Sequence, residues 1–332
     1  MEQSLRQYVE LYEHHRTAIC EHSPSVLNSK RDKALYALRE MKLPRVGSEN
    51  YEITSLSELL GRDYGININR LAMDVNPAES FRCGVPRMST ALFMMINDRF
   101  AMTPISANGL PAGVTVSSFS GLGKEEMQEV APYYGSLASI SNPIVALNTL
   151  LAQDGIVIHV GRNVKVENPL QIVNILNAAV AMMVVRRVLI VLEEGAEVQI
   201  LACDHTQTDE VDLMSLQTIE ISVGRGACLE YYDMEESGKR TVRLSALYLE
   251  QQAESRVTVN GITLYNGTTR NEYHCRFAGE HAELSLCGMG IEDCDRHVDT
   301  YSYVEHKAGH CHTDELFKYV LDDRSRGAFT GM

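Results

Sequence analysis

The chain has 332 residues, a formal net charge of -14, 45% hydrophobic residues and 22% charged residues. This apolar content is enough for a sizeable core and excludes an acidic, disordered chain. A surface that tracks nucleic-acid phosphates needs clustered Lys and Arg, and Arg186-Arg187 is only a pair. We therefore expect no nucleic-acid partner.

Two features of the sequence predict a cytoplasmic protein. The N-terminal residues 1–6 lack the basic and apolar regions of a secretory signal. The cysteines are scattered without a tight framework, which indicates reduced thiols rather than a disulfide scaffold. There are eight of them: Cys20, Cys83, Cys203, Cys228, Cys275, Cys287, Cys294 and Cys311.

The longest apolar stretch covers residues 172–192. A membrane-spanning helix needs about 20 mostly apolar residues. Polar and charged residues interrupt this stretch, namely Asn174, Asn177, Arg186 and Arg187. We interpret it as buried strands with a connection between them, and expect no membrane association.

Residues 1–90 are predicted to form an α-helical N-terminal region. Helical periodicity begins at Leu5 and continues to about residue 43, with a break at Pro24 and a stop near Pro44. A short apolar cluster at 56–60 follows, and a loop-rich junction leads to residue 90.

Residues 91–332 are predicted to form a β core that contains helical segments near 124–151. Residues 93–100 have the pattern of a hairpin around Asn97-Asp98. Residues 124–137 and 143–151 have helical spacing. After Gly155 the chain becomes a succession of short β runs.

These runs form an irregular internal repeat. An apolar run, a polar turn with a small residue and a second run recur, with central alanines separated by 31, 26, 29 and 26 residues: Ala196, Ala227, Ala253, Ala282 and Ala308. A period of 20–50 residues indicates a stacked solenoid or a propeller. A β-sandwich is the alternative, but it favours turns every 8–12 residues. The repeat therefore favours a mainly β fold, a right-handed parallel β-helix.

Three stretches of the chain resemble the SufB/SufD family. The first is 147–172, similar to the segment with which the family enters its β-helix; the others are 187–196 and 317–331. The N-terminal pattern around Leu43, Glu49 and Tyr51 resembles the SufD branch, although Tyr51 stands where Trp is usual. The resemblance implies a scaffold component of the SUF iron–sulfur cluster assembly system.

The resemblance to the SufB/SufD family also implies protein partners and a way of handling iron. A SufD-like chain would pair with a SufB-like subunit and with the ABC-type ATPase SufC, and would catalyse nothing itself. Iron or a nascent iron–sulfur cluster would be held transiently by the complex and not tightly by this chain. The family's Cys- and His-bearing motif and its SufC-docking surface lie beyond the position of Met332, so none of those residues can be assigned here.

Metal-binding residue types gather near the C-terminal end. If His310 and His312 lie on one strand, they point to the same face and could share a metal, with Cys311 on the other side. The alternative is that these are edge residues of the β-helix or of a subunit interface. A wider group surrounds them: Cys287, Cys294, His297 and His306. Four carboxylates suggest a calcium site but fit a solvated turn better: Glu292, Asp293, Asp295 and Asp299.

Two other function classes remain open from the residues alone. One is a self-associating structural β-helix, including a homodimer. The other is a β-helix enzyme acting on polysaccharide, which would need a catalytic acid/base pair and a basic or calcium-lined groove. The sequence contains no G-x-x-x-x-G-K-[ST] phosphate-binding loop and no G-x-S-x-G or H-E-x-x-H motif.

Overall fold

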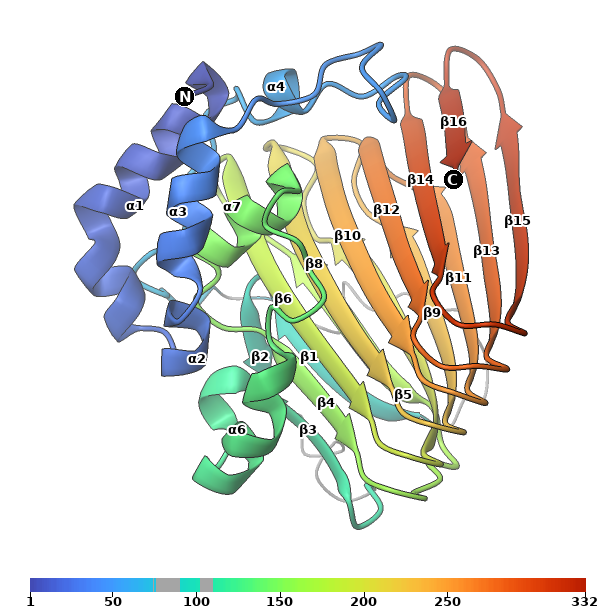
Figure 1. The fold of residues 1–332 in the computed structure, drawn as a ribbon. Helices are drawn as coiled ribbons and strands as arrows, with labels where there is room; N and C mark the ends of the chain where they lie inside the picture. The colour runs from blue at the N-terminus through green and yellow to red at the C-terminus, as the bar shows by residue number, and fades with distance from the viewer. Residues whose placement is uncertain (74, 76–89, 102–109) are drawn as a thin grey trace.

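A computed structural model describes residues 1–73, 75, 90–101 and 110–332 of the chain. Cys83 and the junction predicted around residues 77–86 lie outside the described residues. The predicted β-helix is confirmed, because two eight-stranded sheets run side by side as a solenoid (Figure 1).

Each coil of the solenoid contributes one strand to each sheet. The first sheet has the order β15-β13-β11-β9-β7-β5-β1-β2, and the second has the order β16-β14-β12-β10-β8-β6-β4-β3. The strands of the first sheet are β1 (Ala91–Ile96), β2 (Arg99–Ala101), β5 (Leu170–Leu176), β7 (Glu197–Thr206), β9 (Cys228–Glu236), β11 (Arg256–Tyr265), β13 (Glu283–Glu292) and β15 (His312–Leu321). Those of the second are β3 (Val114–Ser118), β4 (Ile156–Val160), β6 (Met182–Leu192), β8 (Leu213–Val223), β10 (Thr241–Gln251), β12 (Thr268–Phe277), β14 (His297–His306) and β16 (Arg326–Gly331).

Parallel, in-register pairing explains why the repeat is stable. Ile190 of β6 lies opposite Ile221 of β8, and Ile221 lies opposite Leu249 of β10. Side chains in one register position therefore stack from coil to coil, and every second side chain points between the sheets. This interior forms a continuous apolar core, which runs from Phe93 to Leu286.

The helices cover one outer face of the second sheet (Figure 1). They are α1 (Gln3–Glu21), α2 (Ser25–Asn28), α3 (Arg31–Glu40), α4 (Leu56–Leu59), α6 (Lys124–Val130) and α7 (Pro143–Leu151), with short 3₁₀ turns η2 (Phe119–Gly121) and η3 (Ala131–Tyr133). Buried residues of α1, α3 and α7 share a second core with outward-facing side chains such as Met183, Leu216 and Leu244. The sheet is thus covered on both faces where the helices lie, which suits its nearly continuous apolar strands.

The helix predicted at 143–151 and the hairpin at 93–100 are confirmed. Pro143 is the first residue of α7, where its missing N–H costs nothing, and Asn142 caps the helix by accepting from the backbone N–H of Ile144. The helix predicted over 124–137 is shorter. It ends at Val130, two residues before Pro132, and continues only as the turn η3.

The solenoid repeat is present, but two of the five alanines predicted to occupy equivalent positions in successive turns do not do so. A small residue directly precedes each of the strands β7, β9, β11, β13 and β15. These residues are Ala196, Ala227, Ser255, Ala282 and Cys311, of which the first four are buried and Cys311 is half-buried. These residues are joined to the next coil by backbone hydrogen bonds, such as Cys228 N–H to Ala196 O and His312 N–H to Ala282 O. Ala253 and Ala308 lie two and three residues too early.

The residue just before each of these small residues adopts a left-handed backbone conformation. We call this set the left-handed turn column: Gly195, Gly226, Glu254, His281 and His310, with φ between 59° and 70°. Non-glycine residues are uncommon in this region. The column therefore fixes Glu254, His281 and His310 at equivalent places in consecutive turns.

Candidate functional site

The structure separates the three predicted metal ligands. His310 lies in the turn before β15 and belongs to the left-handed turn column, whereas His312 is the first residue of β15 and pairs in register with Glu283. The premise that His310 and His312 share one strand face is therefore wrong. Both side chains are exposed.

Cys311 has a structural explanation. It occupies the small-residue position that Ala282 occupies one coil earlier, and its side chain packs against the main interior core. Its Sγ lies 3.3 Å from the carbonyl oxygen of Gly279 in the neighbouring turn. Within the described residues, no group of three or more His, Cys, Asp or Glu side chains is arranged to hold a metal ion.

The predicted carboxylate group disperses into separate ion pairs. Asp295 pairs with Arg324 in exposed turns at 2.6 Å, and Asp293 pairs with Arg296. Asp299 pairs with Arg270 at 2.7 Å on the outer face of the second sheet. Glu292 is buried, and neither of its carboxylate oxygens has a hydrogen-bond partner among the described residues. The calcium alternative has no support in this arrangement.

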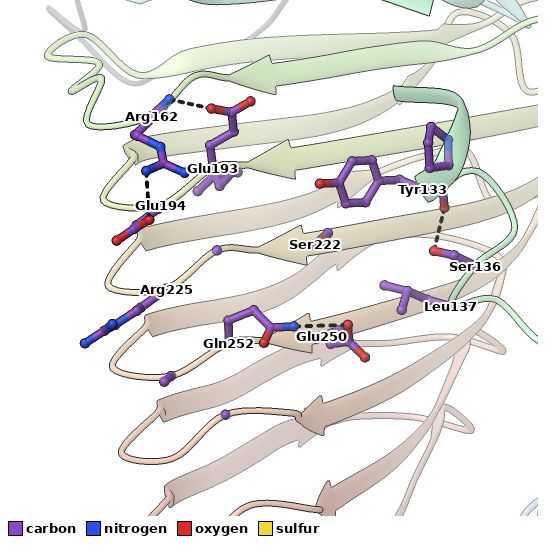
Figure 2. Close-up of a pocket in the computed structure, with 15 residues that line it drawn as sticks. Tyr133, Ser136, Leu137, Arg162, Glu193, Glu194, Ser222, Arg225, Glu250 and Gln252 are labelled. Carbon is purple, nitrogen blue, oxygen red and sulfur yellow. Dashed lines mark hydrogen bonds and ion pairs between the residues drawn. The ribbon is translucent and has the colours of Figure 1, made fainter. Parts of the chain in front are cut away.

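A shallow groove of about 820 Å³ lies along the turns that join the second sheet to the first (Figure 2). Tyr133 and Ser136, from the segment after α6, form one wall, and the ends of β6, β8 and β10 form the other. The charged groups of the groove are lined up on consecutive coils, because each coil contributes the same turn.

Charges in and beside the groove neutralise one another in pairs. Arg162 approaches Glu194 at 3.2 Å, and Arg225 approaches Glu254 at 3.1 Å. The carboxylate of Glu193 accepts from the backbone N–H of Arg162 and lies 3.1 Å from His159 Nε2. Such paired, solvent-exposed groups suit a polar contact surface better than the recognition of a single small ion.

An ionic network fills part of the solenoid interior. Arg186 donates to Asp204 at 2.9 Å, Arg243 donates to the other oxygen of Asp204 at 2.8 Å, and Arg243 also pairs with Asp233. Burial would raise the pKa of Asp204, but the two guanidinium groups outweigh burial and lower it. These side chains come from β6, β7, β9 and β10, so the network ties three consecutive coils together.

Two further interior carboxyls are less well compensated. Burial raises the pKa of Glu235 to about 7, although Thr269 and Ser237 donate to it at 2.8 Å each. Burial and the nearby charge of Glu235 raise the pKa of Glu292 to about 8. Both residues are at most 2% exposed. They are sealed from solvent and cannot contact a dissolved substrate.

A second network fixes the N-terminal region to the outer face of the second sheet. The carboxylate of Glu272 on β12 accepts from Tyr51 Oη and from Asn142 Nδ2, both at 2.5 Å. The Arg270 guanidinium donates to the same carboxylate at 3.1 Å and lies over the Tyr51 ring, 4.1 Å from its centroid. Burial opposes ionisation, but the neighbouring His274, the Arg270 charge and the hydrogen bond from Tyr51 lower the pKa of Glu272 to about 2.

Sequence reasoning missed these networks. The sequence alone presents Arg186 and Arg187 as a basic pair and as interruptions of an apolar stretch, yet both are at most 1% exposed. Adjacent strand residues point to opposite faces, so Arg186 enters the interior and Arg187 faces the helices. A signal was present: charged residues within otherwise apolar β runs require partners when buried, and Asp204 and Glu220 follow on the next strands.

The described solenoid ends differ in character. At one end, β2 and β3 pair antiparallel with β1 and β4 and so interrupt the parallel stack. At the other end, β15 and β16 each pair with one described strand only, and apolar side chains such as Val320, at 62%, are exposed there.

Comparison with known proteins agrees with this architecture. The chain matches the SufBD protein N-terminal region over residues 2–172 and the SUF system FeS cluster assembly SufBD core domain over residues 174–332. The chain belongs to the SufBD family. The second match begins within β5 and covers the regular coils from β6 onward.

One curated relative of this SufBD protein is the iron–sulfur cluster assembly SufBD family protein slr0076 of Synechocystis sp.. The two are 23% identical over 315 residues, which cover 92% of this chain and 69% of the relative. Family membership indicates a role in iron–sulfur cluster assembly and an association with the SUF system. In the described part of this SufBD protein, no helix is long and apolar enough to cross a lipid bilayer.

Proposed function

We propose that this chain is a non-catalytic scaffold subunit of an iron–sulfur cluster assembly complex. It would be SufD-like, pair with a SufB-like subunit, and depend on a SufC-like ABC ATPase for ATP hydrolysis. The observation that carries the proposal is the match of both halves of the chain to the two parts of the SufBD family, at residues 2–172 and 174–332.

The fold supports a scaffold role. Stacked coils give a stiff, elongated body, because each strand is hydrogen-bonded to its neighbours along the whole stack. The polar groove beside Tyr133 offers a surface of the kind that proteins use to meet partners. We propose that iron or a nascent cluster is held transiently by the complex and not tightly by this chain alone.

The reducing cytosol is the proposed compartment. Six described cysteines carry free thiols, which fits that environment: Cys20, Cys228, Cys275, Cys287, Cys294 and Cys311.

Anaerobic affinity capture of the full-length gene product from its own cells tests the proposal. The proteins that copurify are identified by mass, and ATP hydrolysis is measured for the captured assembly and for the isolated chain. We expect a second β-helix protein and an ABC-type ATPase, with hydrolysis in the assembly alone. Recovery of this chain by itself would instead indicate a self-associating β-helix, and hydrolysis by the isolated chain would contradict a non-catalytic role.

A further inference from the structure

Two histidines from neighbouring coils meet at one corner of the solenoid. His281 lies in the β12–β13 turn and His310 in the β14–β15 turn, at equivalent positions of the left-handed turn column. The turns are joined by a backbone hydrogen bond from His281 N–H to Gly309 O. Their backbones are therefore held about one strand spacing apart, roughly 4.8 Å.

The two imidazole rings lie against each other. Their centroids are 5.0 Å apart, and their planes differ by only 10°. Both residues are exposed, and none of their ring nitrogens makes a hydrogen bond to a described residue. A Cβ placed on Gly309 would meet no atom within 4 Å, so the turn is open on this side. The two rings therefore present nitrogens side by side to solvent, without a described protein group between them.

The surroundings favour a cation. Exposed Glu280 is the neighbour of His281 in the chain and forms no ion pair with a described residue. The whole chain carries a net charge of -14, which raises the local concentration of cations. Imidazole nitrogen suits copper, zinc, nickel and iron and discriminates against magnesium and calcium.

We propose that His281 and His310 together bind one divalent transition-metal ion, through one imidazole nitrogen from each ring, with water completing the coordination. The site does not depend on the scaffold function proposed above. It needs only two protein ligands, which keeps the affinity modest and leaves coordination positions open to exchange. Binding weakens in acid, because protons compete for the same nitrogens.

Nearby candidates fit less well. His312 starts β15 and pairs in register with Glu283, so it belongs to the strand rather than to the turn column. Cys311 directs its Sγ toward the Gly279 carbonyl and packs on the interior core. His306 packs on Phe277, with ring centroids 4.6 Å apart, and contacts Thr313 through Nε2.

Titration of the full chain with Cu²⁺ tests the site, with Mg²⁺ as the hard-cation comparison. The variants are His281→Asn, His310→Asn and the double variant. Asn removes the imidazole and tolerates the left-handed backbone, so the turns are expected to persist. His312→Asn is the matched control, since it removes an exposed histidine two residues away. Thermal melts without metal check that all variants fold.

We expect the double variant to bind one Cu²⁺ fewer than the unmodified chain. Each single variant should lose at least about tenfold in affinity at this site, the scale typical for disturbing a metal ligand sphere. Electron paramagnetic resonance of the bound Cu²⁺ should show coupling to imidazole nitrogen that the double variant lacks and that His312→Asn retains. Equal stoichiometry and an identical spectrum in the double variant would overturn the proposal, as would an equal loss in His312→Asn.

Discussion

Arg187 of β6 and Glu220 of β8 form a salt bridge on the face of the second sheet that the helices cover, with both side chains 1% exposed. Glu220 also accepts from the backbone N–H groups of Gly135, Leu137 and Ala138. The pair thus connects two coils with the segment that leads into α7. Removal of one partner leaves a buried, uncompensated charge.

Arg187→Met should therefore lower the free energy of unfolding by about 3–5 kcal/mol, the range for breaking a buried ion pair. Urea denaturation followed by circular dichroism measures this loss. Arg225→Met is the matched control, because Arg225 and Glu254 are paired at the surface, and it should change stability by less than about 1 kcal/mol. Equal losses in the two variants would show that burial of the Arg187 pair is unimportant.

Glu272 should make the fold sensitive to acid. Its pKa is lowered to about 2, so the folded state holds fewer protons than the unfolded state between pH 4.5 and 2. The stability contributed by ionised Glu272 is complete above the unfolded value and is lost as the pH falls through this window, on the order of 3 kcal/mol in all. Glu272→Gln should flatten the dependence, as measured by urea denaturation at pH 5, 4 and 3. Tyr51→Phe removes one hydrogen-bond donor to Glu272 and should flatten the pH dependence of stability partly. An unchanged pH dependence in Glu272→Gln would contradict the role given to Glu272.

Glu235 should make the fold less stable as the pH rises, which is the opposite of the effect of Glu272. Its pKa is raised to about 7, so the folded state holds more protons than the unfolded state between about pH 4.5 and 7. Stability from this carboxyl is therefore greatest in acid and falls as the pH rises through that window, by roughly 3 kcal/mol. Glu235→Gln should stabilise the protein at pH 8 relative to the unmodified chain and have little effect at pH 4.5. Destabilisation at pH 8 would mean that ionised Glu235 is needed by Arg243.

Gly279 in the β12–β13 turn should be intolerant of a side chain. A Cβ there would lie 2.0 Å from the backbone nitrogen of Ala253 in the neighbouring turn, so the stacked turns must separate. Gly279→Ala should lower the free energy of unfolding by about 1–3 kcal/mol, the usual cost of overpacking. Gly309→Ala is the control one coil further on, because its Cβ would meet nothing within 4 Å. Thermal melts should show a lower Tm for Gly279→Ala alone; equal melts would argue against close stacking of these turns.

The sequence predicts the solenoid well because each coil repeats the same physical problem. Every strand needs alternate apolar residues, and every turn needs a small residue, so the pattern recurs at a visible period. The register of the repeat is harder to predict from the sequence, since Ala253 and Ser255 are both small and lie in one turn. Backbone hydrogen bonds between coils, such as Glu283 N–H to Ser255 O, decide the register, and single-coil patterns do not contain them.

The proposed metal site at His281 and His310 was also hard to predict from the sequence, because it depends on contacts between coils. His281 and His310 are 29 positions apart, and only the stacking of two turns brings their rings together. His310 and His312 are neighbours in the chain, which made them the obvious pair, but the left-handed conformation of His310 places it outside the strand. Contacts between coils depend on register, so a one-residue error in alignment changes every predicted neighbour.

The most direct test of the scaffold account is anaerobic cluster reconstitution on the isolated chain and on the captured assembly, each supplied with Fe²⁺ and sulfide and then desalted. Iron and acid-labile sulfide are measured per chain, with the visible absorption of the cluster as a second readout. The account predicts that only the assembly retains both elements in a fixed ratio. A stable, stoichiometric cluster on the isolated chain would contradict it.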